Sequence, residues 1–176
     1  MEDIRNLQNK VNHYKTVLAN TRTYRQNWIA GLRDFIKGDL EKMIEATSLD
    51  AKVIIKEGME NLEAVVLTLG DVKSGIYEPI NNDVKRHLIK HNGSLVYQQL
   101  FNGKVIVLIQ YPMIEGYGQP RPPKTIAIYR PDEIKGPYLV RHMESFISEV
   151  TNWEDYDDDE PSQKIGFHMN FQNTEE

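Results

Sequence analysis

Asp71 and Lys73 are the residues whose types and spacing come nearest to a catalytic site. They follow an apolar run that ends at Leu69, and Glu63 and Asp50 lie upstream. Carboxylates and a lysine beside a strand are the groups with which a magnesium-dependent nuclease holds its metal and orients water. Only the spacing supports this interpretation. The alternative is simpler, since a glycine followed by an aspartate is an ordinary way to end a strand. A nuclease-like enzyme around Asp71 and Lys73 is therefore one alternative function.

His87 and His91 are four residues apart, the spacing that places two imidazoles on one face of a helix, where both can hold a metal. Zinc hydrolases of this kind carry glutamate after the first histidine, but position 88 is leucine. The sequence has no cysteine, no phosphate-binding loop and no nucleophile elbow. We therefore predict no catalytic residues, no metal and no cofactor, and the sequence favours a protein that is not an enzyme.

Charge is distributed very unevenly along the 176 residues, whose formal net charge is −5. Residues 1–33 hold six cations and two anions, whereas residues 144–176 hold one cation and ten anions. Six of those anions fall within 154–160, where their mutual repulsion favours an extended, solvated loop. Opposite charges also steer and orient protein partners. Electrostatic docking, within one chain or between chains, is accordingly predicted for Arg22, Arg25 and Arg33 with Glu154, Asp155, Asp157, Asp158, Asp159 and Glu160.

A second alternative function is nucleic-acid binding through the same basic segment. Arg22 and Arg25 lie close to Tyr24 and Trp28, and proteins that bind single strands combine cations with aromatic rings in this way. Trp28, however, falls on an apolar helix face, and the acidic segment 144–176 repels phosphate. The sequence therefore ranks nucleic acid below protein as a partner.

Apolar residues recur at alternating steps of three and four from Ile4 to Phe35, as in the seam of a coiled coil. The pattern predicts a helix that continues to Ala46, with Gly31 and Gly38 as the places where it would bend. At 1.5 Å per residue such a helix spans roughly 64 Å, whereas a compact domain of this length is only about 40 Å across. A straight helix therefore extends beyond its own domain, and its apolar face needs a partner.

This excess length predicts that the helix either folds back at a glycine over its own sheet or associates with another chain. The second outcome is favoured, so the main functional hypothesis is a non-enzymatic structural or adaptor subunit that assembles with itself or with other chains. A phage virion or a secretion machine is built from parts of this kind. The residues predicted to form the oligomer interface are Ile4, Leu7, Val11, Tyr14, Leu18, Trp28, Leu32 and Phe35.

After the helix the apolar periodicity changes to two, which predicts strands. These strands cover residues 52–57, 62–69, 94–101, 104–111 and 125–130, with a type I′ turn at Asn102-Gly103. Short helices are predicted between Asn81 and Gly93 and from Pro137 onward. Residues 164–172 alternate apolar and polar side chains, which predicts a last strand.

The predicted fold class is α+β, with a long N-terminal helix, an antiparallel sheet of about five to six strands and two further helices. The expected segments are a helical docking segment at 1–47, an α+β domain at 48–151, an acidic linker at 152–163 and a strand at 164–172. No run of about 18 apolar residues occurs, so no membrane partner is expected. The lack of cysteine suits a reducing compartment, and we expect the protein in the cytoplasm or in a particle assembled there.

Overall fold

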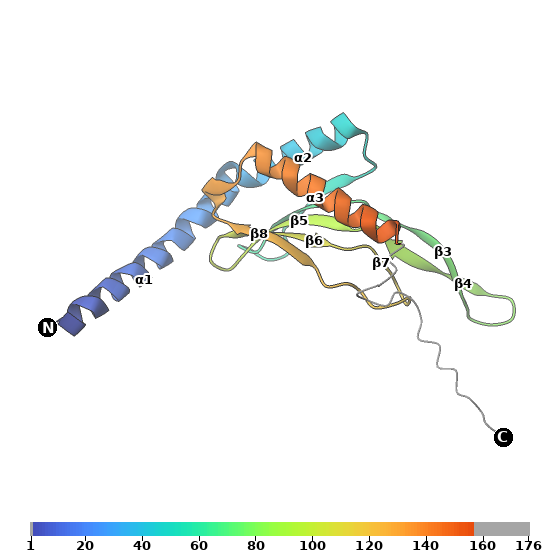
Figure 1. The fold of residues 1–176 in the computed structure, drawn as a ribbon, viewed down its shortest axis with the longest axis horizontal. Helices are drawn as coiled ribbons and strands as arrows, with labels where there is room; N and C mark the ends of the chain where they lie inside the picture. The colour runs from blue at the N-terminus through green and yellow to red at the C-terminus, as the bar shows by residue number, and fades with distance from the viewer. Residues whose placement is uncertain (1, 157–176) are drawn as a thin grey trace, which may run out of the picture.

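The computed structural model describes residues 2–156, in which a helical N-terminal segment is followed by eight strands and a final helix (Figure 1). The α+β class and the long N-terminal helix are confirmed. The helical elements are α1 (Glu2–Asn27), a π-helical turn (Trp28–Leu32), α2 (Arg33–Thr47), a single 3-10 turn η2 (Pro131–Glu133) and α3 (Gly136–Glu154). No helix among the described residues is long and apolar enough to cross a membrane.

The strands form two antiparallel sheets. The five-stranded sheet has the order β1-β2-β5-β6-β8, and the three-stranded sheet has the order β3-β4-β7. The bounds of the first are β1 (Lys52–Lys56), β2 (Ala64–Thr68), β5 (Ser94–Gln99), β6 (Val105–Gln110) and β8 (Lys124–Tyr129). The bounds of the second are β3 (Asp71–Pro79), β4 (Lys85–His91) and β7 (Met113–Ile114).

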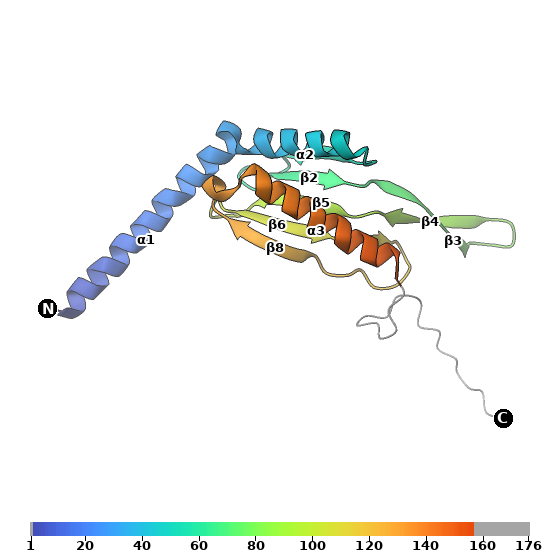
Figure 2. The same ribbon diagram turned by 45° about the horizontal axis from the view of Figure 1, so that its top comes forward.

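A long hairpin connects the two sheets, because β2 is followed by β3 and β4 by β5, and the chain also passes from β6 into β7. The backbone bonds Leu69 N–H to Gly93 O (3.1 Å) and Asn92 N–H to Gly70 O (2.9 Å) bridge the junction. Gly70 and Gly93 have φ values of 76° and 98°, which side-chain-bearing residues rarely adopt, so the chain turns there. The β3–β4 arm therefore projects from the end of the molecule opposite the free end of α1 (Figures 1 and 2).

The core lies between one face of the five-stranded sheet and the two helices α2 and α3, which lie over that face (Figure 2). Alternate residues of the strands point toward the helices, as the period of two requires. Ile36 and Leu40 of α2, with Leu139 and Phe146 of α3, are fully buried against them. The sheet residues buried on this face are Val65, Leu67, Leu95, Tyr97, Val105, Val107 and Ile109. We call this sheet with α2 and α3 the body.

The helix predicted between Asn81 and Gly93 is wrong, since residues 85–91 form strand β4. The Asn81 side-chain oxygen does accept bonds from two backbone N–H groups, those of Asp83 (3.0 Å) and Val84 (2.9 Å). Asn81 therefore closes the turn of the arm and does not cap a helix. The prediction failed because an asparagine side chain forms these bonds equally well in both structures. The described fold consequently has one full helix after α2 and not two.

Of the two glycines at which a bend was predicted, only Gly31 lies at one. It interrupts the helical dihedral angles between α1 and α2, with φ 173° and ψ −23°, whereas Gly38 lies inside the uninterrupted α2. Helix α3 continues to Glu154, into the first residues of the acidic linker expected at 152–163. The rest of that linker from 157 on and the strand at 164–172 lie outside the described residues. We call the bent turn Trp28–Leu32 the elbow.

Candidate interaction surface

Helix α1 leaves the body at the elbow and extends away from it (Figure 1). Residues 3–19 are all exposed. Among them are five large apolar side chains of the heptad pattern, which we call the exposed stripe. The exposed fractions are Ile4 69 %, Leu7 60 %, Val11 36 %, Tyr14 63 % and Leu18 51 %. A row of this kind on a projecting helix is an apolar surface that no other part of the described residues 2–156 covers.

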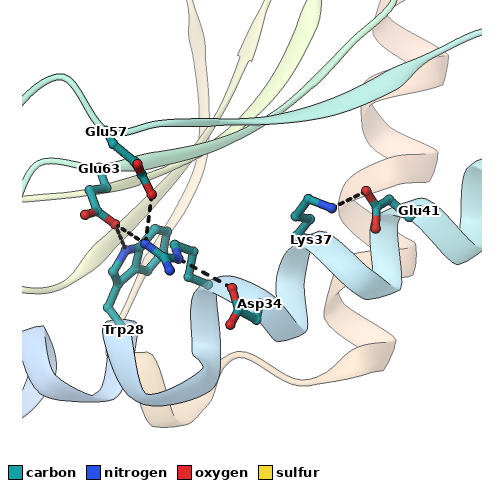
Figure 3. Close-up of polar contacts among 7 residues, drawn as sticks. Trp28, Asp34, Lys37, Glu41, Glu57 and Glu63 are labelled. Atoms are coloured by element: carbon teal, nitrogen blue, oxygen red, sulfur yellow. Dashed lines mark hydrogen bonds and ion pairs between the residues drawn. The ribbon is translucent and has the colours of Figure 1, made fainter.

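Trp28 anchors the elbow to the body. Its ring is fully buried, and the indole Nε1 donates a hydrogen bond to Glu63 Oε2 at 3.0 Å. Arg33 donates to the same oxygen at 3.1 Å and to Glu57 Oε1 at 3.2 Å. Figure 3 shows the side chains of Trp28, Glu57 and Glu63 gathered at this point. A buried indole N–H needs an acceptor, and Glu63, immediately before β2, supplies it.

The charges of Arg33 and Glu63 stabilise the contacts of the elbow. The hydrogen bond to Glu63 is the main reason that the pKa of Arg33 is raised above its ordinary value, and the nearby Asp34 carboxylate contributes as well. Glu63 thus accepts from a neutral donor and a charged donor at once, which fixes its carboxylate. Farther along α2, Lys37 and Glu41 form an ion pair one turn apart (Figure 3).

A second contact fixes the direction of α1, where the β5–β6 turn rests on the helix. A Cβ atom at Gly103 would lie 2.7 Å from Tyr24 Cβ and 2.9 Å from the Thr21 carbonyl oxygen, so only glycine fits here. Arg25 Nη2 donates a hydrogen bond to the backbone oxygen of Phe101 in the same turn, at 2.7 Å. Two contacts, at the elbow and at this turn, therefore hold the last two turns of α1.

The heptad positions of α1 share one helix face, but only part of that face is covered. Trp28 is buried, and Thr21 and Arg25 are partly covered by the body. From Leu18 toward the N-terminus the same face has no body beside it and is exposed. The surface that packs on the body and the surface that lacks a partner are thus two lengths of one stripe.

The predicted interface residues therefore divide into three groups. The five residues of the exposed stripe are accessible, and Phe35 on α2 is 39 % exposed. Leu32 is partly buried against the core. Trp28 belongs to the core of its own chain, so we leave it out of the interface proposed below.

The residues predicted to dock by charge also lie apart. Arg25 and Arg33 bond to acceptors in their own chain, while Arg22 is exposed. Glu154 ends α3 and forms an ion pair with Lys90 of β4. Asp155 is exposed, and the predicted docking residues Asp157, Asp158, Asp159 and Glu160 lie outside the described residues.

The residues considered for catalysis do not assemble into one site. Asp71 and Lys73 lie at the start of β3, whereas Glu63 precedes β2, about 25 Å away along the strand direction. Asp71 Oδ1 is 2.6 Å from His91 Nδ1, and His91 Nε2 is 2.8 Å from Glu115 Oε1. Hydrogen bonds to Asp71 and then Glu115 raise the pKa of His91. The two carboxylates lie on opposite sides of the ring, so they face the imidazole and not a common metal.

His87 and His91 lie on a strand, where four residues span about 13 Å, too far for one metal. His87 packs against Tyr77 across the arm, with ring centroids 4.4 Å apart. Within residues 2–156 no group of three or more metal-binding side chains converges.

Sequence reasoning missed Phe101, the most exposed large apolar side chain of the described chain at 77 %. It precedes Asn102-Gly103 in the turn that contacts α1 at Thr21 and Arg25. An aromatic residue next to a tight turn was the available signal, but nothing local showed that α1 lies there. No protein-family model, curated protein or solved structure matches the chain.

Proposed function

We propose that this protein is a non-enzymatic structural or adaptor subunit that self-associates through the exposed stripe of α1. The observation that carries the proposal is the overhang: residues 3–19 are exposed on all sides, although the stripe continues a face that is buried at Trp28. The proposed interface residues are Ile4, Leu7, Val11, Tyr14 and Leu18.

The size of the stripe supports association of moderate strength. Fully burying a large aliphatic or aromatic side chain contributes roughly 1.5–3 kcal/mol, and these five are already partly covered by their own helix. Ten such side chains from two copies, each about half exposed, contribute on the order of 8–17 kcal/mol, against an association cost of about 4–15 kcal/mol. A net gain of about 8 kcal/mol lies within this range and corresponds to a dissociation constant near the micromolar range.

The proposal places the protein in an assembly of protein chains, such as a component of a phage virion or of a secretion machine, in the cytoplasm or in a particle formed there. The uneven charge supports an additional contribution from the basic helix and acidic residues. Exposed charges are screened over about 10 Å at 0.1 M salt, so raising the salt concentration should weaken that contribution and leave the apolar one.

The test is the native mass of the full chain at micromolar concentration, measured by light scattering or sedimentation. The wild type should form a dimer or larger oligomer. The double variant Leu7→Asp/Val11→Asp should weaken association by at least about a hundredfold, because burying carboxylates costs several kcal/mol and 1.4 kcal/mol is tenfold.

Asn9→Asp/Thr16→Asp is the matched control, since it adds the same charge on the opposite face of the same turns. It should associate like the wild type. A wild type that stays monomeric at every accessible concentration would falsify the proposal, and equal weakening by both double variants would remove the stripe as its basis.

A further inference from the structure

We infer that the partner of the exposed stripe is the α1 helix of a second copy, in antiparallel orientation about a two-fold axis. This inference rests on the self-association proposed above and specifies its geometry. It follows from the heptad spacing, from the positions of two lysines and from the place where the body covers α1.

The heptad spacing allows the stripe to pair with itself in antiparallel register. In this arrangement each residue at one seam position meets the other seam position of the second copy. Leu7 then packs on Leu18 of the second copy, and Val11 packs on Tyr14 of the second copy. Ile4 reaches Thr21 of the second copy, which is the seam position where the body starts to cover the helix. Every residue of the exposed stripe is used, and each contact occurs twice by symmetry.

Lys10 and Lys15 distinguish the two orientations. They flank the stripe on opposite sides, at the positions where charges set the orientation of helix pairs. In a parallel pair Lys10 would face Lys15 of the second copy, and the repulsion would occur twice. In the antiparallel register Lys10 faces Val17 of the second copy and Lys15 faces Gln8, so no like charges meet.

The position of the body excludes the parallel pair independently. The β5–β6 turn lies against α1 at Thr21 and Arg25, on the same face as the exposed stripe. Two parallel helices joined through the stripe would bring both bodies to the same end, each on the face turned toward the other. In the antiparallel pair the bodies lie at opposite ends, so neither obstructs the contact.

The same arrangement gives a role to Phe101. The N-terminal turn of each helix ends beside the β5–β6 turn of the other copy, where Phe101 is 77 % exposed. Ile4 of the second copy is the apolar residue that reaches this turn. Phe101 therefore extends the interface beyond the two helices.

The orientation is tested by disulfide cross-linking of full chains, which is simple because the sequence contains no cysteine. The variants are Leu7→Cys, Leu18→Cys and, as a control on the opposite face, Asn9→Cys. A disulfide requires Cα atoms closer than about 7 Å. In the antiparallel pair residue 7 faces residue 18, whereas two copies of residue 7 are about 16 Å apart. An equimolar, re-equilibrated mixture of Leu7→Cys and Leu18→Cys should form covalent dimers under mild oxidation, and neither variant alone should do so.

The outcomes separate this inference from the proposed function. Cross-linking of Leu7→Cys with itself, in a protein that associates, would establish the parallel pair and overturn the inference alone. Association without any cross-link in the mixture would overturn the helix pairing and leave self-association standing. Cross-linking of Asn9→Cys at the same yield would show random collisions and count against the inference. A monomeric wild type would overturn both proposals.

Discussion

Helices α1 and α2 belong to one stretch of sequence with apolar residues at helical spacing throughout, yet their environments differ completely. In α2 the apolar side chains Ile36 and Leu40 are fully buried against the sheet. In α1 the equivalent stripe ends at Leu18 in solvent, 51 % exposed. The difference in burial arises because α2 lies over the five-stranded sheet and most of α1 has no sheet beside it, although both helices carry an apolar face. An apolar stripe thus shows that a helix needs a neighbour, and only the fold shows whether its own chain provides one.

The largest expected effect separates the buried and exposed ends of this stripe. Trp28→Ala should lower the free energy of unfolding by about 3–5 kcal/mol, because it leaves a cavity and removes the donor that Glu63 bonds. Leu7→Ala, measured where the protein is dissociated, should change it by less than about 0.5 kcal/mol. Urea denaturation gives the free energy of unfolding of both variants. Trp28→Ala is made in the non-associating Leu7→Asp/Val11→Asp protein, so that its loss of stability is measured on a monomer. Equal losses of unfolding free energy in Trp28→Ala and Leu7→Ala would show that the projecting residues 3–19 unfold together with the body.

The second prediction concerns acid, which should act on the body and not on the overhang. His142 is buried between two tyrosines, with Tyr97 Oη 3.0 Å from Nδ1 and Tyr129 Oη 2.9 Å from Nε2. Burial lowers the pKa of His142 to about 4. The unfolded chain takes up this proton near pH 6.5 and the folded chain only near 4, so stability is lost as the pH falls between those values. The loss attributable to His142 should reach about 3 kcal/mol.

Denaturation of wild type and His142→Gln at pH 7, 6, 5 and 4 measures this effect. The variant should be less stable at pH 7 and should lose less stability on acidification. Parallel pH profiles for the two proteins would contradict the assignment. His91 has the opposite sign, since its raised pKa makes its contribution largest in acid and lost as the pH rises, and it is present in both proteins.

The smallest expected change in stability is at Gly103, where the β5–β6 turn fixes the direction of α1. Gly103→Ala should lower the free energy of unfolding by about 1–3 kcal/mol, because the residue has φ 78° and its new Cβ would collide with Tyr24. Gly58→Ala is the control, since nothing lies within 4 Å of its Cβ position. Native mass should also show weaker association for Gly103→Ala, because the helix is pushed away from the turn. Identical behaviour of the two variants would mean that the turn does not direct α1.

Much of this architecture was predictable from local patterns. The helices of the structure and the strands of the five-stranded sheet follow from periodicity, which acts over a few residues. The β5–β6 turn lies where Asn102-Gly103 predicted it, but it is not of type I′, because Gly103 has a positive φ and Asn102 does not, and the Gly103 N–H donates to the Leu100 carbonyl oxygen. The bend at Gly31 was also among the predicted positions. The arm was not predicted, because Asn81 and the residues after it carry signals that a hairpin turn and a helix start share.

The contacts that define the candidate surface were hidden for a different reason. Glu63 accepts a bond from Trp28, 35 residues earlier in the chain, and Gly103 receives Tyr24 across nearly 80 positions. No local pattern encodes such pairs, so the sequence predicted the stripe but not the residue at which its burial ends. Trp28 was accordingly assigned to the interface, although its surroundings place it in the core.

Because α1 is fixed to the body at one end, the length of its exposed part determines the direction in which the exposed stripe faces. Each residue inserted between Leu18 and Thr21 would advance the free end by about 1.5 Å and turn the stripe by about 100° around the helix axis. Seven insertions, by contrast, nearly restore the original azimuth and add about 10 Å. The helix can therefore lengthen with little change in the direction of the stripe when about seven or eleven residues are added, but not when one or two are added.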